Sequence, residues 1–378
     1  MTQPELPAPQ LITQPEQLLA FLETLHGEPL LAVDTESNSL YAYREQVCLI
    51  QFSLPQVDTL LDPLALPDLS LLAPIFASQA IEKVFHAAEY DLICLKRDYG
   101  FTFQNIFDTM VAARILGWER FGLGSILEEH FGVRMNKKFQ RADWGARPLE
   151  REHLEYARLD THFLIRLRDQ MKASLIEKGL WELAREDFVR GCAVNGTAPA
   201  AKEDMCWRVN GARDLSRREL AVLQELCLYR DAAAARLDRP HFKVMGDRTL
   251  IAIATQAPAS LDALRRVPGV AEWLLRKHGR GVVEAVRRGL QVEPPRPPQR
   301  TRPDQDYVAR MEAMRSWRKR RAQAWGVESD VVLPRDLMEQ IVEENPRDHA
   351  SLGKVLASVP WRLDKYGVEI LAELKELV

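Results

Sequence analysis

The chain has 378 residues, which is too long for one typical domain and indicates two or three. Its 46% hydrophobic and 28% charged residues fit a globular protein, and it contains no apolar run of about 18 residues that would cross a membrane. The start lacks the basic and apolar segments of a secretory signal, and the five cysteines form no CxxC pair. We therefore expect a cytoplasmic protein with reduced thiols, no membrane partner and no obligate protein partner.

The first half of the chain predicts a mixed sheet. Buried or alternating runs predict strands at 30–34, 47–53 and 57–62, and their close succession indicates an antiparallel start. A helical pattern at 69–78 follows, and then two units in which a strand leads into a helix, at 81–99 and 104–116. Residues 121–190 read as mostly helical. This order predicts an α/β domain with a mixed sheet flanked by helices.

The second half predicts two copies of one small helical domain. An ungapped shift of 88 residues places Tyr229 on Trp317, Trp273 on Trp361 and Gly279 on Gly367. Irregular or proline-rich linkers are predicted at 193–206 and 291–306. The predicted order is an N-terminal α/β domain at 1–195, a first helical repeat at 208–290, a linker at 291–306 and a second helical repeat at 307–378.

Charge differs between the two halves. Residues 1–200 carry a formal charge of −9 and residues 201–378 a charge of +6. An acidic front and a basic back fit a metal-dependent enzyme with a polyanion-binding tail, although ordinary surfaces also reach these values. The basic run at 317–321, "WRKRR", is a candidate phosphate-contacting surface, with a solvated helix face as the alternative.

Carboxylates stand at the ends of predicted elements. Asp34 and Glu36 follow a buried strand, and because side chains alternate on a strand, both point the same way. Such a pair repels unless a cation or a proton lies between its members. Asp91 begins a predicted helix, and Tyr156 and Asp160 are four residues apart on another. If these acids converge, they can bind two divalent ions that clamp a displacement at phosphorus, whereas a loop with exposed acids is the alternative.

The amino-acid sequences of these segments resemble those of a known family. The stretches "VDTESNSLYAYREQVCLIQFS", "VFHAAEYDLICLKRDYG", "IFDTMVAARILG" and "HLEYARLDTHFL" resemble the exonuclease motifs of ribonuclease D, within the DEDD superfamily of 3′→5′ exonucleases. The helical repeats resemble the helicase-and-ribonuclease-D C-terminal (HRDC) domain. The resemblance implies a ribonuclease-H-like α/β domain followed by two all-α HRDC domains, and a 3′→5′ exoribonuclease that releases nucleoside 5′-monophosphates.

The resemblance also implies roles for single residues. Asp34, Glu36, Asp91 and Asp160 would bind two divalent ions, Mg²⁺ or Mn²⁺, and the Tyr156 hydroxyl would hold the attacking water. A sister subclass has histidine where this chain has glutamate, one residue before the tyrosine, so the chain resembles the tyrosine subclass. The implied partner is RNA, tRNA precursors above all. Single-stranded DNA stays open because a serine follows the first acidic pair, and a non-catalytic binding protein is a third reading.

Four residues are candidate substrate contacts, each with a structural alternative. Leu40 would touch the last base or pack on the sheet, and His86 would approach a phosphate or cap a helix. Gln140 and Trp144 would line the entry for the 3′ end, with Trp144 stacking a base or packing its loop. Asp108, a fifth acid, is predicted to cap the helix that starts at residue 109.

Overall fold

The computed structural model describes residues 6–193, 202–296 and 304–375. The chain divides into two compact units, each described here by itself. One unit comprises Met1–Glu36, Val47–Gly196 and Arg302–Val378, and the other comprises Ser37–Gln46 and Thr197–Thr301. Residues 194–201 and 297–303 of the two predicted linkers lie outside the described ranges. Among the described residues, no helix is both long and apolar enough to span a membrane.

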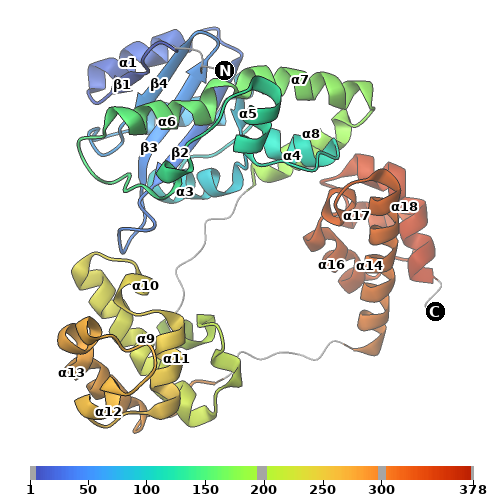
Figure 1. The fold of residues 1–378 in the computed structure, drawn as a ribbon. Coiled ribbons are helices and arrows are strands. Elements are labelled where there is room, and N and C mark those ends of the chain that lie inside the picture. The colour runs from blue at the N-terminus through green and yellow to red at the C-terminus, as the bar shows by residue number, and fades with distance from the viewer. Residues whose placement is uncertain (1–5, 194–201, 297–303, 376–378) are drawn as a thin grey trace. The chain divides into compact units, whose positions relative to one another are not determined.

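The N-terminal α/β domain is built on a six-stranded sheet in the order β1-β4-β3-β2-β5-β6 (Figure 1). Strands β3 and β4 are antiparallel, whereas β1 with β4, β2 with β5 and β5 with β6 are parallel. The predicted mixed sheet is therefore confirmed. The strands are β1 Gln10–Ile12, β2 Leu30–Ser37, β3 Val47–Leu54, β4 Val57–Leu61, β5 Glu82–Phe85 and β6 Ile106–Asp108.

Strand β3 shows why the sheet is central to this domain. All eight of its residues are buried, which is the pattern of a strand covered on both faces. Strand β1 escaped prediction because it has three residues and therefore no readable periodicity. Its partner is β4, whose Leu60 lies opposite Leu11.

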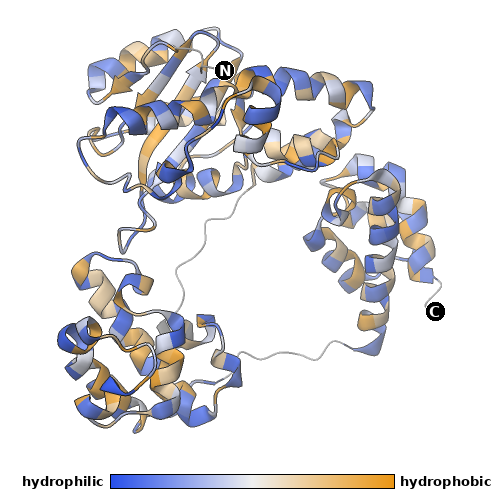
Figure 2. Ribbon diagram, in the orientation of Figure 1, coloured by the Kyte–Doolittle hydropathy of each residue, from blue (hydrophilic) through white to orange (hydrophobic). Residues whose placement is uncertain are grey.

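Helices cover the sheet and mix hydrophobic with hydrophilic residues along their length (Figure 2). Helix α6 packs on β3 and β4, and α7 and α8 pack with α4 near β5 and β6. The start of α3, the end of β2 and helix α6 therefore all belong to this one domain. The helices are α1 Pro15–Thr24, α2 Ala73–Ala77, α3 Glu89–Tyr99, α4 Thr109–Ile115, α5 Leu123–Phe131, α6 Arg151–His162, α7 Leu164–Glu177 and α8 Trp181–Gly191, with 3₁₀ turns η1 Ser70–Leu72 and η2 Lys137–Arg141.

The first three helices of the two helical repeats share their bounds at the predicted offset of 88 residues. Helix α9 begins at residue 217 and α14 at residue 305, and the pairs α10 and α15 and α11 and α16 keep the same offset. Each repeat has its own hydrophobic core. The elements are η3 Lys202–Arg208, η4 Ala212–Asp214, α9 Arg217–Leu237, α10 His241–Val244, α11 Asp247–Gln256, α12 Leu261–Arg265 and α13 Glu272–Gly289, then α14 Gln305–Trp325, α15 Ser329–Val332, α16 Arg335–Glu344, α17 His349–Val355 and α18 Pro360–Lys375.

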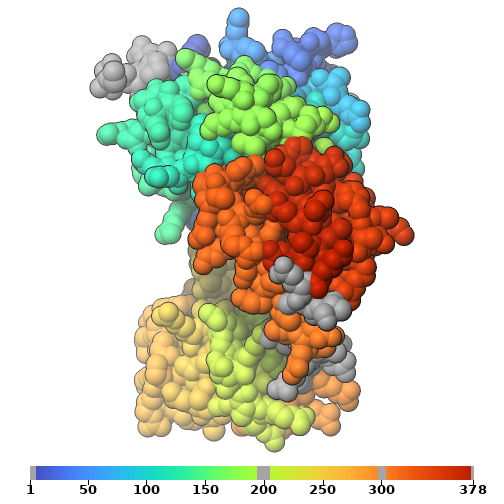
Figure 3. Space-filling view, turned by 90° about the vertical axis from the view of Figure 1, so that its right-hand side faces the viewer, coloured from blue at the N-terminus to red at the C-terminus, as the bar shows by residue number. Residues whose placement is uncertain are grey.

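The second helical repeat packs on helix α8 of the α/β domain within the same unit (Figure 3). Arg362 of α18 is fully buried there and donates to the carboxylates of Glu186 (3.0 Å) and Asp187 (2.9 Å). Its other donors reach the backbone carbonyls of Val331 and Val332. Each of the three nitrogens of this buried guanidinium thus donates a hydrogen bond where the repeat meets the α/β domain.

Candidate active site

The C-terminal end of β2 brings two carboxylates toward a third. Asp34 and Glu36 alternate with Thr35 on the strand, and Asp160 comes from α6. One carboxylate oxygen of each of these acids lies within 4.8 Å of the others. The sheet-borne pair and the helix-borne acid, more than 120 residues apart, therefore meet in the folded chain, and the alternative of a loop with scattered exposed acids does not apply.

Asp91 joins them from the first turn of α3, where it is 7% exposed. The residue between the two strand acids holds it in place: the backbone N–H and the hydroxyl of Thr35 both donate to Asp91 Oδ1, the N–H over 3.1 Å. Asp91 is close enough to raise the pKa of both Asp34 and Glu36. We call Asp34, Glu36, Asp91 and Asp160 the acid cluster.

Burial and mutual repulsion shift the titration of the whole acid cluster. Burial is the largest cause in each case, and it raises the pKa of Asp91 to about 7 and, with repulsion from Asp91, that of Asp160 to about 8. The pKa values of Asp34 and Glu36 are also raised well above their usual range, by burial and then by the neighbouring acids. Four converging carboxyl groups that disfavour their own ionisation fit a site completed by hard divalent cations, which prefer carboxylate oxygens.

Tyr156 lies one helical turn before Asp160 and faces the acids. Burial and the charges of Asp160 and Glu36 raise the pKa of its phenol further above neutrality, so the hydroxyl stays protonated. The ring packs against Phe139 (5.6 Å between centroids) and Trp144 (6.2 Å). A protonated, sterically fixed phenol can donate a hydrogen bond or orient a water molecule, but it is a poor general base.

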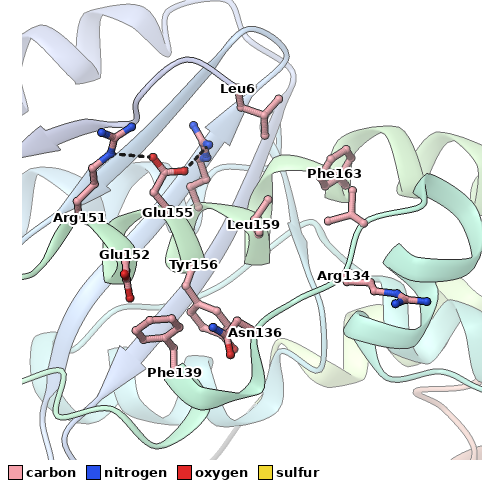
Figure 4. Close-up of a pocket in the computed structure, with 12 residues that line it drawn as sticks. Leu6, Arg134, Asn136, Phe139, Arg151, Glu152, Glu155, Tyr156, Leu159 and Phe163 are labelled. Atoms are coloured by element: carbon pink, nitrogen blue, oxygen red, sulfur yellow. Dashed lines mark hydrogen bonds and ion pairs between the residues drawn. The ribbon is translucent and has the colours of Figure 1, made fainter. Parts of the chain in front are cut away.

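A cavity of about 860 Å³ opens beside Tyr156 (Figure 4). Its wall includes Phe139 and the cationic side chain of Arg134, so it offers both an aromatic and a basic surface. Glu155, which stands where the sister subclass has histidine, lines the same cavity and is paired with Arg151 and Arg158. Its carboxylate is therefore engaged by arginines rather than by the acid cluster.

The candidate substrate contacts differ in their exposure and in what they pack against. Trp144 is only 2% exposed and packs against Tyr156 and His153, so the geometry favours its packing alternative over base stacking. Gln140 is exposed on η2, next to the cavity-lining Phe139. Leu40 is 38% exposed in the segment 37–46 and is not part of the sheet's core.

His86 and Asp108 have structural contacts. The Nδ1 atom of His86 lies 2.9 Å from the Thr109 hydroxyl, and burial lowers the pKa of the imidazole, so His86 is held neutral against the start of α4. Asp108 accepts the N–H groups of Met110 and Val111 as the cap of α4, which confirms its predicted role.

Asp108 also holds the turn at residues 87–88, a second contact that the sequence did not predict. Its carboxylate accepts the N–H groups of Ala87 (3.0 Å) and Ala88 (2.8 Å), the turn that leads into α3. Ala87 has φ of 61°, a left-handed conformation that non-glycine residues adopt at a cost. Asp108 therefore fixes the start of the helix that carries Asp91. The fragment "IFDT" gives the cap but not this second contact.

Comparisons with known proteins agree with this geometry. A family model described as a 3′-5′ exonuclease matches residues 9–176, and the HRDC domain model matches residues 219–286 and 308–374. The ribonuclease D of Acidiphilium cryptum is 30% identical over 320 residues, covering 82% of this chain and 81% of that protein. The ribonuclease D of Gluconacetobacter diazotrophicus is 32% identical over 286 residues, covering 74% and 72%.

A solved structure is similar over almost the whole chain. Escherichia coli RNase D, described as an exoribonuclease involved in structured RNA processing, is 26% identical with a TM-score of 0.70. The match covers 97% of this chain and 99% of that one. The predicted fold class, an α/β exonuclease domain followed by helical HRDC domains, is therefore confirmed.

Proposed function

Since this chain belongs to the ribonuclease D family and is a 3′→5′ exoribonuclease, we propose that it trims structured RNA precursors, tRNA precursors above all, from their 3′ ends. The family depends on divalent metal, and the acid cluster provides the matching ligands. The observation that carries the proposal is the convergence of Asp34, Glu36 and Asp160 within 4.8 Å, with Asp91 held beside them by Thr35. The sequence identity with ribonuclease D proteins supports RNA as the substrate class. The similarity to Escherichia coli RNase D, which is described as acting in structured RNA processing, supports structured RNA as the substrate.

We assign the acid cluster as the ligands of two divalent ions, Mg²⁺ or Mn²⁺. Bound there, the ions would supply positive charge to the scissile phosphate and make water nucleophilic near neutral pH. The four carboxyl groups fit this role because burial, and then neighbouring negative charges, raise their pKa values, and a bound cation would offset both effects. Binding of cations would displace the protons that the acids otherwise keep.

Tyr156 positions the water. Its protonated hydroxyl orients the attacking oxygen, and the rigid contacts with Phe139 and Trp144 keep that hydroxyl in one place. The water oxygen bonds to phosphorus as the bond from phosphorus to the 3′ oxygen of the preceding nucleotide breaks. The released nucleotide keeps the phosphate as a 5′-monophosphate, and the shortened RNA regains a 3′ hydroxyl.

The test uses RNA labelled at its 5′ end, once as an unstructured strand and once as a tRNA precursor with a 3′ extension. With Mg²⁺ or Mn²⁺ we expect a ladder that shortens one nucleotide at a time from the 3′ end, and no reaction in EDTA. Trimming of the precursor that stops near the folded tRNA supports the substrate proposal. Faster degradation of single-stranded DNA than of RNA would instead favour the DNA alternative, and an intact RNA with either metal would contradict the assigned site.

A further inference from the structure

One face of α13 in the first helical repeat is basic and carries an exposed aromatic ring. Trp273, Arg276, Lys277 and Arg280 follow the spacing i, i+3, i+4 and i+7, which places them along one side of the helix over about 10 Å. All four are exposed, and the indole of Trp273 is 44% exposed. We call these four residues the basic stripe.

The opposite side of α13 fixes how the basic stripe is presented. Gly289 lies so close to α9 that a Cβ atom there would come within 2.4 Å of the Val222 backbone. Leu274, Val282 and Val286 are buried on the same side. Tight packing of this side holds the basic stripe on the outer side of the first helical repeat.

The charges of the basic stripe are not neutralised within the described residues. Arg276, Lys277 and Arg280 form no ion pair there, whereas the acids nearby are already engaged. Glu272 pairs with Arg265, and Glu284 pairs with Arg287. A further cation, Arg236 of α9, is exposed. Burial, and then the charges of Arg236 and Lys277, lower the pKa of the His278 imidazole, so both cations lie near that ring. The positive surface therefore extends from α13 onto α9.

The second helical repeat lacks this surface although it shares the fold. At the offset of 88 residues, Arg276 becomes Asp364, Arg280 becomes Val368 and Arg236 becomes Ala324. Trp273 becomes Trp361, which is partly buried and packs with Trp325 and the α/β domain. The equivalent face thus has one lysine, one acid and no free ring.

The basic run 317–321 does not replace it. Trp317 is buried, Arg318 donates to the Leu333 carbonyl, and Arg320 and Arg321 are paired with Glu373 and Glu369. Most side chains of the predicted phosphate-contacting surface on this helix therefore already have partners within the protein.

We propose that the basic stripe is a binding site for single-stranded RNA, with Arg276, Lys277 and Arg280 on successive phosphates and Trp273 stacking on a base, and that the first helical repeat alone carries this site. The inference rests on the proposed function for the identity of the ligand. An exposed ring beside unpaired cations is the surface that tracks a single strand without reading its sequence. A second contact on the same chain raises the local concentration of substrate for the exonuclease.

Binding of a fluorescein-labelled 20-nucleotide RNA to the full chain in EDTA tests this site without any hydrolysis. The variant Arg276→Gln/Lys277→Gln/Arg280→Gln should lower affinity and reduce the slope of log affinity against log salt by about 2, because each lost single-strand phosphate contact removes about 0.7. The matched control Lys319→Gln/Arg320→Gln/Arg321→Gln removes three charges from the second repeat and should leave the slope unchanged. Trp273→Leu should weaken binding roughly tenfold with an unchanged slope.

The outcomes separate the two proposals. An unchanged slope in the stripe variant, or an equal loss in the control, would overturn the RNA site. Equal affinity of the wild type for RNA and for an abasic strand of the same length would overturn the stacking role of Trp273. A wild type that binds RNA through the basic stripe but does not shorten it with metal would overturn the proposed function and leave the site standing. Hydrolysis of a trinucleotide should be the same in the stripe variant and the wild type.

Discussion

Two buried clusters of charge in this protein are built on opposite principles. The acid cluster gathers four carboxyl groups from β2, α3 and α6, and burial, followed by repulsion between neighbouring acids, raises their pKa values. The second cluster pairs Arg362 with Glu186 and Asp187 where the second helical repeat meets α8. Within the described residues no basic side chain forms an ion pair with the first cluster, whereas in the second a guanidinium pairs with both carboxylates. The difference separates a site that needs a ligand from a contact that holds the fold together.

The energetics of the two clusters differ accordingly. Burying like charges costs free energy that a bound cation or proton can recover, so the acid cluster couples stability to metal and pH. A buried opposite pair roughly balances its desolvation cost, but removal of one partner leaves an uncompensated charge. The comparison therefore predicts that charge removal stabilises the metal-free fold in one cluster and destabilises the fold in the other.

The largest expected effect is that of Asp160→Asn. We expect a loss of RNA hydrolysis on the order of 10³-fold, because a lost metal ligand removes several kcal/mol of transition-state stabilisation. In EDTA at pH 8.5 the same variant should melt at the same temperature as the wild type or higher, since one repelling charge is gone. Single-turnover kinetics and thermal melts measure the two effects. A variant that is less stable without metal would contradict the assignment of Asp160 to a repelling cluster.

Removal of Arg362 should have the opposite sign. Arg362→Leu leaves the buried Glu186 and the partly buried Asp187 without their cation, and we expect a loss of roughly 3–5 kcal/mol in the unfolding free energy of the unit. The matched control is Arg190→Gln, which breaks an exposed pair with Asp336 at a cost of about 1 kcal/mol or less. Urea unfolding of the full chain compares the two. Equal losses would mean that the buried cluster contributes no more than a surface pair.

The sequence predicts one cluster and conceals the other for a physical reason. Strand alternation places Asp34 and Glu36 on one face, and Tyr156 and Asp160 lie one helical turn apart. Local geometry alone therefore identifies most of the residues of the site as candidates. Arg362 depends on contacts across some 175 residues that no local pattern encodes. Its one signal lies in the repeat: Arg362 aligns with Leu274, a core residue of the first copy.

The candidate substrate contacts show the same limit. An aromatic in a polar loop reads equally well as a stacking surface or as a packing anchor, and burial alone distinguished them for Trp144. The second contact of Asp108 escaped for a similar reason, because the turn at 87–88 is near in space but some 20 residues away in sequence. Residue type predicts chemistry well, whereas exposure and tertiary partners require the fold.

Stability against pH gives a smaller, graded effect. The folded-state pKa values of about 7 for Asp91 and about 8 for Asp160 lie above the usual value near 4, so their contribution is fully present below about pH 4 and is lost as pH rises through 7 to 8. In EDTA the melting temperature should therefore fall between pH 5.5 and 8.5, and less so in Asp160→Asn. Added Mn²⁺ should raise it most at the alkaline end. A wild-type profile parallel to that of the variant would refute this coupling.

The smallest effect expected is that of Thr35→Val, which tests where Asp91 belongs in the comparison. Asp91 lies among like charges, yet it accepts two hydrogen bonds from Thr35, so it combines features of both clusters. Loss of the hydroxyl leaves the backbone donor and should lower kcat by about tenfold, the scale of residues that orient metal ligands. Thr35→Ser keeps the hydroxyl and is the matched control. Because the lost donor favoured the ionised carboxylate of Asp91, the valine variant should also need more Mn²⁺ for half-maximal rate. A purely structural role for Thr35 would instead lower the melting temperature of the variant and leave its Mn²⁺ requirement unchanged.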